Sequence, residues 1–117
     1  MVSETIKGEE FSVDLNGTTQ TIHFKGTVRL QTGEDYAPIV ALLNKGIDEA
    51  TGELVLDFRQ LNFLNSSGIN AISKFVISAR KEERSGLKVI GNKDIYWQQK
   101  SLQNLQKLWA KVQIEII

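Results

Sequence analysis

The chain has 117 residues, of which 41% are hydrophobic and 24% are charged; these proportions are typical of one globular domain rather than of a disordered or fibrous chain. Its 14 basic and 14 acidic residues cancel, so no net positive charge is available to attract nucleic acid or an anionic membrane surface. Cysteine is absent and His23 is the single histidine, which excludes disulfides and thiolate catalysis and argues against a zinc site. We therefore expect a single domain, residues 1–117, with no metal or other cofactor.

The first quarter of the chain contains two short segments in which hydrophobic and polar residues alternate. One covers residues 11–15 and the other residues 22–24, and Asn16-Gly17 follows the first. Alternation of this kind around an Asn-Gly pair predicts a β-hairpin. Beyond Gly26 the alternation continues through Leu30, either as a third strand or as an extension of the second strand through a bend.

The remaining two-thirds of the chain alternate between helix-like and strand-like segments. Hydrophobic residues at intervals of three and four predict a helix over about 35–49, a second with its hydrophobic stripe at 69–79 that stops at Ser85-Gly86, and a third with its stripe at 102–109. Short hydrophobic runs predict strands at 54–56, 87–90 and 112–116. Because strands that alternate with helices form parallel crossovers, this order predicts an α/β fold whose mixed sheet joins an antiparallel hairpin to parallel βαβ units.

Motifs that would indicate an enzyme are absent from the sequence. The chain has neither the GxGxxG pattern of dinucleotide-binding sites nor the GxxxxGK[ST] pattern of phosphate-binding loops. His23 falls within a strand pattern, and the sequence places no nucleophile beside it, so we interpret it as a structural or surface residue. We therefore expect a non-enzymatic protein.

Neither a secretion signal nor a membrane span is indicated. Residues 1–5 lack the basic-then-hydrophobic pattern of a signal peptide, and no hydrophobic run approaches the roughly 18 residues of a membrane-spanning helix. The expectation is a cytoplasmic protein without nucleic-acid or membrane partners.

One stretch in the middle of the chain is more specific than these general patterns. It reads Leu54-Val55-Leu56-Asp57-Phe58, then Leu61, then Phe63-Leu64-Asn65-Ser66-Ser67-Gly68-Ile69. This resembles the signature of STAS domains, the family of the bacterial anti-sigma-factor antagonists, in which a buried strand ends in Asp, a short apolar loop follows, and Asp-Ser-Ser-Gly-Leu opens the next helix. The resemblance extends over the order of elements from about residue 20 onward. It implies a STAS-like mixed sheet with helices packed mainly on one face.

The resemblance also implies a signalling function by partner switching. Ser66 would be the phosphoacceptor of a serine kinase that also acts as an anti-sigma factor, and a metal-dependent serine phosphatase would reverse the modification. The unphosphorylated domain would bind the kinase and displace the transcription regulator that the kinase holds. Asp57, Asn65, Ser67 and Gly68 would flank the phosphosite and contribute to partner docking.

The position of Ser66 has a physical reading of its own. A serine in the first turn of a helix lies beside unpaired backbone amides and the positive end of the helix dipole, so a phosphate is tolerated there. Gly68 would leave the approach to Ser66 free of a side chain. The alternative is that Ser66 or Ser67, with Ser67 the better candidate, only caps the helix, a role worth about 1 kcal/mol.

Two departures from the family pattern keep other functions open. Asn65 stands where the family has an acidic residue, and Gly26-Thr27-Val28-Arg29 stands where it has a Gly-Glu-Leu-Asp type of stretch. Arg29 and Arg59 make the local field less negative, so either arginine would pair with a phosphate on Ser66 or hold another anion. The alternatives are therefore a domain that binds a small anion or a nucleotide at this helix start, and a non-switching scaffold subunit of a signalling assembly.

Overall fold

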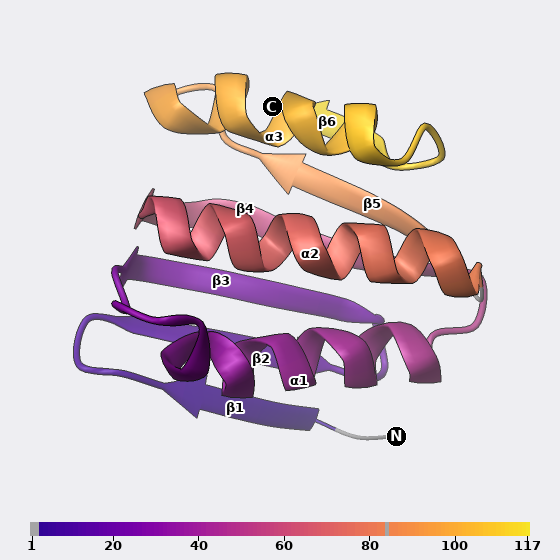
Figure 1. The fold of residues 1–117 in the computed structure, drawn as a ribbon, viewed down its shortest axis with the longest axis horizontal. Helices are drawn as coiled ribbons and strands as arrows, with labels where there is room; N and C mark the ends of the chain where they lie inside the picture. Colours follow the sequence, from indigo (N-terminus) through magenta and orange to yellow (C-terminus); the bar gives the residue numbers. More distant parts are fainter. Residues whose placement is uncertain (1–2, 84) are drawn as a thin grey trace.

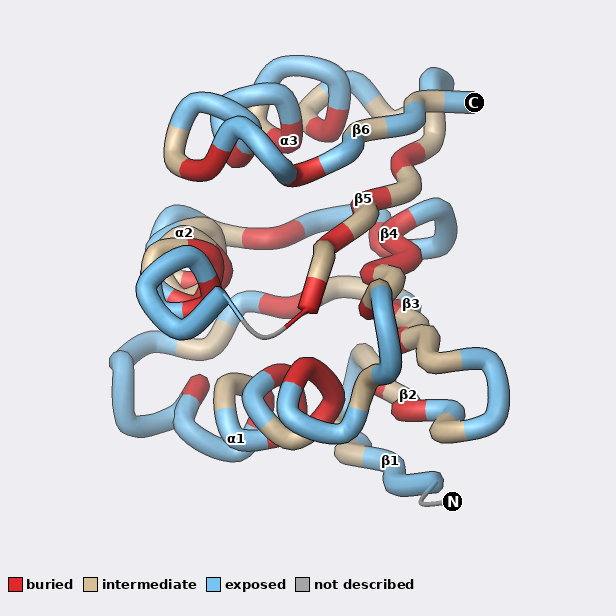
Figure 2. The backbone as a smooth tube through the Cα atoms, turned by 90° about the vertical axis from the view of Figure 1, so that its right-hand side faces the viewer, coloured by how far each residue is buried: buried red, intermediate tan, exposed pale blue. Residues whose placement is uncertain are grey.

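Six strands form one sheet in chain order, and three helices lie on one of its faces in the computed structural model (Figures 1 and 2). The model describes residues 3–83 and 85–117, so Met1 and Val2 of the amino terminus considered above lie outside it. The strands are β1 (Ser3–Lys7), β2 (Phe11–Asn16), β3 (Thr21–Val28), β4 (Glu53–Leu64), β5 (Gly86–Gly91) and β6 (Gln113–Ile116). The helices are α1 (Gly33–Glu49), α2 (Ser66–Glu82) and α3 (Tyr96–Leu108). Neighbours from β1 to β3 are antiparallel and those from β3 to β6 are parallel, which confirms the predicted mixed α/β sheet.

The amino-terminal part of the sheet contains one strand more than predicted, and it decides how the chain continues beyond Gly26. β3 runs through Gly26 as a single strand, so the residues after Gly26 extend the second strand of the hairpin through a bend and do not form a separate strand. Gly26 has a φ of 90°, and a Cβ there would lie 2.1 Å from the carbonyl oxygen of Glu10, so this bend requires glycine. β1 was not predicted, because four of its five residues are exposed and only Ile6 is partly buried, which leaves too few hydrophobic residues to show an alternation.

β4 is longer than its sequence pattern predicted. The predicted strand ended at Asp57, whereas the observed strand continues to Leu64. The pairing with β5 does end at Asp57, which lies opposite Ile90. Beyond that point β4 is paired with β3, up to the pair Val28 and Leu64. The strand therefore persists where its hydrophobic run stops, because β3 supplies the hydrogen-bonding neighbour.

The hydrophobic core lies between the sheet and the helices. It is built from the inward side of the central strands and the facing stripe of each helix, and its most buried members include Ile22, Phe24, Leu54, Leu56, Phe58, Leu42, Leu43, Phe75 and Val76. Burial of each such side chain contributes about 1.5–3 kcal/mol. All three helices begin at the same end of the sheet, on the left in Figure 1, where the parallel strands have their carboxyl ends.

Candidate functional site

Asn65, and not a serine, caps the amino terminus of α2. Its side-chain oxygen Oδ1 accepts a hydrogen bond from the backbone N–H of Gly68 at 2.9 Å. This corrects the prediction that Ser66 or Ser67 caps the helix. The backbone of Asn65 is extended, with φ −76° and ψ 175°, and this conformation at the residue before the helix lets its side chain reach the first turn.

The Asn65 side chain is held by two further contacts from other elements. The hydroxyl of Tyr36 on α1 donates to Oδ1 at 2.6 Å, and the amide Nδ2 donates to the carbonyl oxygen of Leu30 at 2.8 Å. Tyr36 is only 2% exposed, and this burial raises the pKa of its hydroxyl, which therefore stays a donor at neutral pH. A carboxylate at position 65 has no N–H for Leu30, which gives a physical reason for asparagine where the STAS signature has an acidic residue.

Gly68 is required by packing beneath the helix start. A Cβ at this position would lie 2.2 Å from Cδ1 of Leu64 and 2.7 Å from the hydroxyl of Tyr36. The glycine is buried and faces the core, so the prediction that it leaves the approach to Ser66 free of a side chain was wrong. Its absence of a side chain instead lets α2 lie close to β4 and α1.

Ser66 and Ser67 differ in their surroundings. Ser66 is exposed, and the structure gives its hydroxyl no hydrogen bond among the described residues. Ser67 is half-buried and lines a shallow groove of about 240 Å³ between α1 and α2, together with Gly33 and Lys74 among others. No acidic residue lies in the first turn of α2. Ser66 therefore presents a free hydroxyl to solvent at the positive end of the helix dipole.

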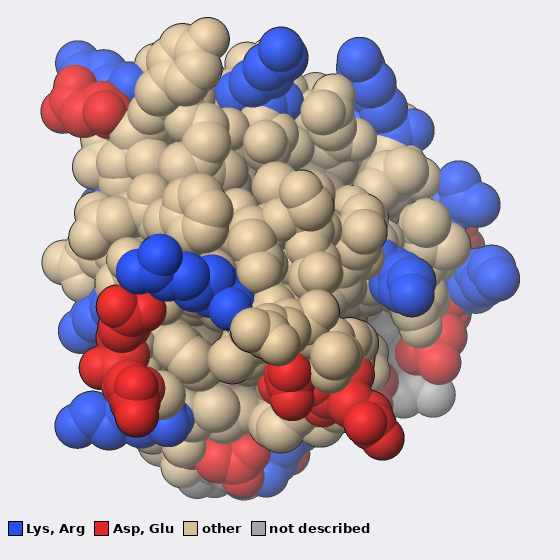
Figure 3. All heavy atoms as spheres, turned by 60° about the vertical axis from the view of Figure 1, so that its left-hand side comes forward, with Lys and Arg blue, Asp and Glu red and all other residues tan. Residues whose placement is uncertain are grey.

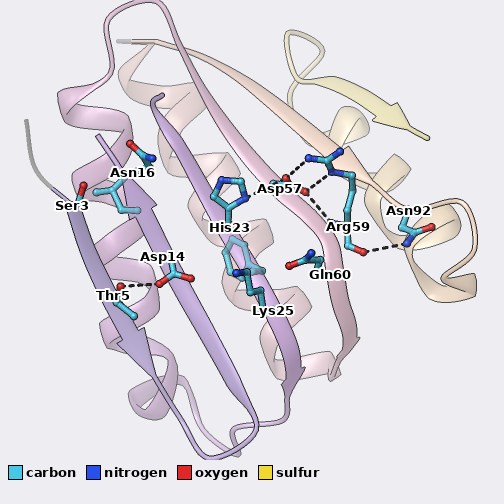
Figure 4. Close-up of a pocket in the computed structure, with 12 residues that line it drawn as sticks. Ser3, Thr5, Asp14, Asn16, His23, Lys25, Asp57, Arg59, Gln60 and Asn92 are labelled. Atoms are coloured by element: carbon cyan, nitrogen blue, oxygen red, sulfur yellow. Dashed lines mark hydrogen bonds and ion pairs between the residues drawn. The ribbon is translucent and has the colours of Figure 1, made fainter. Parts of the chain in front are cut away.

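The structure does not bring Asp57 and Arg59 to Ser66. Both side chains point to the sheet face that the helices leave open (Figure 4). Oδ1 of Asp57 lies 3.0 Å from Nε of Arg59, and Oδ2 lies 2.8 Å from Nη2. The rise of about 3.3 Å per strand residue puts roughly 20 Å of β4 between Asp57 and its carboxyl end, where α2 begins. Asp57 therefore does not flank the phosphosite.

The Asp57 carboxylate is buried and fully hydrogen-bonded. Its side chain is 7% exposed, and besides the guanidinium of Arg59 it accepts the backbone N–H of that residue at 3.0 Å. Burial raises the pKa of Asp57, but the hydrogen bonds and charge of Arg59, with a smaller effect of His23, outweigh burial and leave the pKa below its ordinary value. The carboxyl group is therefore ionised at neutral pH.

Arg29, in contrast, follows β3 close to the helix start. Its two neighbours in the chain both bind Asn65, since the carbonyl oxygen of Val28 accepts from the Asn65 backbone N–H at 3.2 Å and that of Leu30 accepts from its side chain. The Arg29 guanidinium binds the carboxylate of Glu10 at 3.1 and 3.2 Å. Both partners are more than half exposed, and such surface pairs are worth about 0–1 kcal/mol, so Arg29 can exchange Glu10 for another anion at little cost.

His23 is a site residue that the sequence did not identify as one. Its Nδ1 lies 3.2 Å from Oδ2 of Asp57, because the parallel register of β3 and β4 places the two residues side by side. The two positions are far apart in the chain, so only the strand register could have revealed the contact. The interpretation of His23 as a surface residue holds, since its side chain is 40% exposed.

The end of the molecule at which the helices begin has few charges at its centre. Figure 3 brings this end forward and shows a broad area without Lys, Arg, Asp or Glu, with charged side chains mostly around its margin. Two large hydrophobic side chains that belong to this end are exposed: Phe63, just before α2, is 44% exposed, and Tyr96, the first residue of α3, is 88% exposed. Trp97 beside them is held by a hydrogen bond from Nε1 to the carbonyl oxygen of Asn62 at 2.9 Å.

Solved structures match nearly the whole chain, whereas no family model and no curated protein matches it. Apo-SiaC from Pseudomonas aeruginosa is 16% identical with a TM-score of 0.73, over 99% of this chain and 98% of its own. A chain of the complex between the diguanylate cyclase SiaD and its activator SiaC, from the same organism, is 13% identical with a TM-score of 0.71, over 97% and 99%. An anti-sigma factor antagonist from Mycobacterium paratuberculosis is 15% identical with a TM-score of 0.55, over 96% and 84%. The chain has a STAS-like fold.

The STAS-like fold confirms what the stretch around Ser66 implied about architecture. The sheet begins antiparallel and continues parallel, and the three helices lie on one face (Figure 2). Over residues 3–83 and 85–117, no group of three or more His, Cys, Asp or Glu side chains could hold a metal ion. No helix in those ranges has the length and hydrophobicity to cross a membrane.

Proposed function

We propose that this chain is a non-enzymatic interaction domain of the bacterial cytoplasm, which binds a signalling protein at the end of the sheet where α2 begins, and that phosphorylation of Ser66 controls the binding. The observation that carries the proposal is that Asn65 caps the helix while Ser66 is exposed. Asn65 supplies the helix cap, so the exposed Ser66 hydroxyl is not needed for the fold. A phosphate can be added to Ser66 without removing a structural hydrogen bond.

The surroundings of Ser66 suit a phosphate. The modification adds about −1.5 to −2 charges and three acceptor oxygens. The first turn of α2 has no acidic residue to repel it, and the helix dipole favours negative charge at this point. Arg29 lies near the helix start, and its ion pair with Glu10 is exposed. We therefore assign Arg29, and not Arg59, as the arginine that pairs with the phosphate.

The exposed side chains of Phe63 and Tyr96, at the end of the molecule where the helices begin, are proposed to contact the partner. Interface centres are depleted of charge and enriched in aromatic residues, and a few aromatic side chains supply most of the binding energy. Because Phe63 precedes Ser66 by three residues in the chain, a phosphate on Ser66 places charge at the margin of this contact. Binding and phosphorylation are then mutually opposed.

The partner is proposed to be a signalling enzyme. SiaC is described as the activator of the diguanylate cyclase SiaD, and SiaC resembles this chain at a TM-score of 0.73, against 0.55 for the anti-sigma factor antagonist. These values support testing a diguanylate cyclase of the native host first. A serine kinase of the anti-sigma type would phosphorylate Ser66, and a metal-dependent serine phosphatase would restore the binding form.

The experiment compares Ser66 with its neighbour. Ser66→Ala, Ser66→Asp, Ser67→Ala and Ser67→Asp are used to capture the purified cyclase and kinase of the native host. We expect Ser66→Asp to weaken capture at least about tenfold and both Ser67 variants to retain it. Intact-mass measurement of the protein from its host should show an additional mass of about 80 Da that Ser66→Ala abolishes. Equal capture by all four variants, together with no serine-dependent mass, would overturn the switch.

A non-switching scaffold is the second candidate, and the exposed aromatic pair supports it independently of Ser66. In that case Phe63→Ser and Tyr96→Ser weaken capture of the partner while Ser66→Asp leaves it unchanged. Because Phe63 and Tyr96 are exposed, both variants are expected to fold, and far-ultraviolet circular dichroism checks this. The two candidate functions therefore predict different results for one variant: Ser66→Asp weakens capture of the partner by a switch and leaves capture by a scaffold unchanged.

A further inference from the structure

A second site lies on the sheet face that the helices leave open. There the strands border a hollow of about 790 Å³ (Figure 4), a volume within the range of about 300–1,000 Å³ that small-molecule sites occupy. The hollow is centred on β3 and β4 and extends to β1 and β2. Its polar lining includes Asp14, His23, Lys25, Asp57, Arg59 and Gln60.

A β-bulge in β4 aims two consecutive side chains into this hollow. Between the pairs His23 with Asp57 and Lys25 with Gln60, β3 has one residue and β4 has two. In a regular strand, Arg59 and Gln60 would point to opposite faces of the sheet. Here both are exposed, between the buried Phe58 and Leu61, so both lie on the open face that borders the hollow. Bulges often re-aim side chains at functional sites.

The bulge is held from behind by side chains of α3 and of the segment before it. Nε2 of the fully buried Gln98 donates to the carbonyl oxygens of Phe58 and Leu61 at 2.6 and 2.8 Å. Its Oε1 accepts the backbone N–H of Asn92 at 2.8 Å, and Nδ2 of Asn92 donates to the carbonyl oxygen of Arg59 at 3.2 Å. Gln98 thus supplies donors to carbonyl oxygens that β5 does not reach, because the pairing of β4 with β5 ends at Asp57.

Asp57 orients the two groups on either side of it. Its buried carboxylate binds Nδ1 of His23 and both Nε and Nη2 of Arg59, as Figure 4 shows. In the part of the chain that the structure describes, Nε2 of His23 and Nη1 of Arg59 have no hydrogen-bond partner and can meet a ligand. Lys25 follows His23 on the same face of β3, and within the described ranges its ammonium group has no ion-pair partner. Three nitrogen-bearing side chains thus border the central part of the hollow.

The other side of the hollow has different chemistry. Thr5, Asp14 and Asn16 come from β1 and β2, and Oγ1 of Thr5 donates to Asp14 at 2.7 Å. Carboxylate and amide groups bind hydroxyls, while Lys25 and Arg59 suit a phosphate. We propose that the hollow binds a small phosphorylated sugar, free or as part of a nucleotide, with its phosphate at Lys25 and Arg59 and its hydroxyls at Asp14 and at Nδ2 of Asn16. Oδ1 of Asn16 accepts the backbone N–H groups of Thr18 and Thr19 and belongs to the turn.

The formal charges that border the hollow balance. Those of Asp14 and Asp57 cancel those of Lys25 and Arg59, so the phosphate is held by direct hydrogen bonds rather than by a net field.

The primary test is a titration of the ¹⁵N-labelled chain with ribose 5-phosphate, with ribose and inorganic phosphate as separate arms. We expect saturable amide shifts at His23, Lys25 and Arg59 with ribose 5-phosphate, weaker binding of phosphate alone and none of ribose. Lys25→Gln and Arg59→Gln should each weaken binding about tenfold or more. Their matched controls, Lys107→Gln on α3 and Arg29→Gln at the helix start, should not.

Several outcomes overturn the proposal. One is the absence of saturable shifts up to about 10 mM ligand, far weaker than functional small-molecule binding; another is equal affinity of Arg59→Gln and Arg29→Gln. If Arg59→Gln fails to fold because Asp57 loses its main partner, Lys25→Gln decides alone, since Lys25 does not contact Asp57. If inorganic phosphate bound as tightly as ribose 5-phosphate, the proposal that the site also binds the sugar hydroxyls would be wrong.

Ser66→Ala should bind ribose 5-phosphate like the wild type, so failure of this site and failure of the phosphoswitch are distinguishable.

Discussion

The buried hydroxyl of Tyr36 on α1 donates a hydrogen bond of 2.6 Å to the side chain of Asn65, which in turn caps α2. The start of α2 is therefore fixed by a helix that precedes it in the chain and not only by its own first turn. Removing the hydroxyl in Tyr36→Phe leaves the Asn65 oxygen with one donor fewer, and we expect a loss of about 1 kcal/mol in the free energy of unfolding. Urea denaturation measures it. Tyr96→Phe, at an 88% exposed position, is the matched control and should change nothing.

The assignment of the cap to Asn65 predicts an unequal series at the helix start. Asn65→Ala removes the cap and leaves Tyr36 and the Leu30 carbonyl without their partner, so a loss of about 2–3 kcal/mol in the free energy of unfolding is expected. Ser66→Ala and Ser67→Ala should each stay within about 0.5 kcal/mol of the wild type. If Ser67→Ala lowered the free energy of unfolding more than Asn65→Ala does, Ser67 and not Asn65 would be the helix cap.

Replacing glycine by alanine should have opposite effects on the free energy of unfolding at two positions near helix starts. Gly68→Ala places a methyl group against Leu64 and Tyr36, and overpacking of this kind costs about 1–3 kcal/mol. Gly33→Ala meets nothing within 4 Å and lies in the first turn of α1, where alanine gains up to about 1 kcal/mol over glycine. Thermal or urea unfolding of the two variants gives the comparison, and equal effects would contradict the close packing at Gly68.

Gln98 should be among the costliest polar residues to replace. Gln98→Leu has a similar size but leaves the carbonyl oxygens of Phe58 and Leu61 and the N–H of Asn92 without partners, so a loss of at least about 3 kcal/mol is expected. The exposed Gln103→Leu on the same helix should stay within about 0.5 kcal/mol. The amide resonances of Arg59 should also shift in Gln98→Leu, because the bulge that aims this residue loses its support.

The lowered pKa of Asp57 predicts how the free energy of unfolding depends on pH at the acidic end. Burial raises its pKa, but Arg59 and, less strongly, His23 outweigh burial, and the net pKa in the folded state lies below the ordinary value. The ionised group therefore stabilises the fold fully above the unfolded-state pKa of about 3.9, and this contribution is lost as the pH falls through the lower folded-state pKa. Between about pH 5 and pH 2, the urea midpoint of the wild type should fall more steeply than that of Asp57→Asn. The exposed Asp94→Asn should keep the wild-type slope.

Local patterns in the sequence were sufficient for most of the elements. The three helices, the hairpin and the parallel strands follow from periodicities of about 3.6 and 2 residues, which depend on neighbours in the chain. The same patterns placed Ser66 in the first turn of a helix, and the structure has it there. The edge strand β1 escaped prediction because its exposed residues carry no such period.

The contacts around the two sites depend on residues that are distant in the chain. Whether Asn65 or Ser67 caps α2 is decided by Tyr36 and Leu30, which no local pattern places beside them. The continuation of β4 past Asp57 depends on its pairing with β3, and that pairing carries Arg59 away from Ser66 and sets His23 against Asp57. The sequence by itself determined most of the elements and the place of Ser66 at a helix start, because these follow from local patterns. Only the tertiary structure decided the edge strand β1, the length of β4 and which side chains meet, because strand register and helix docking are non-local.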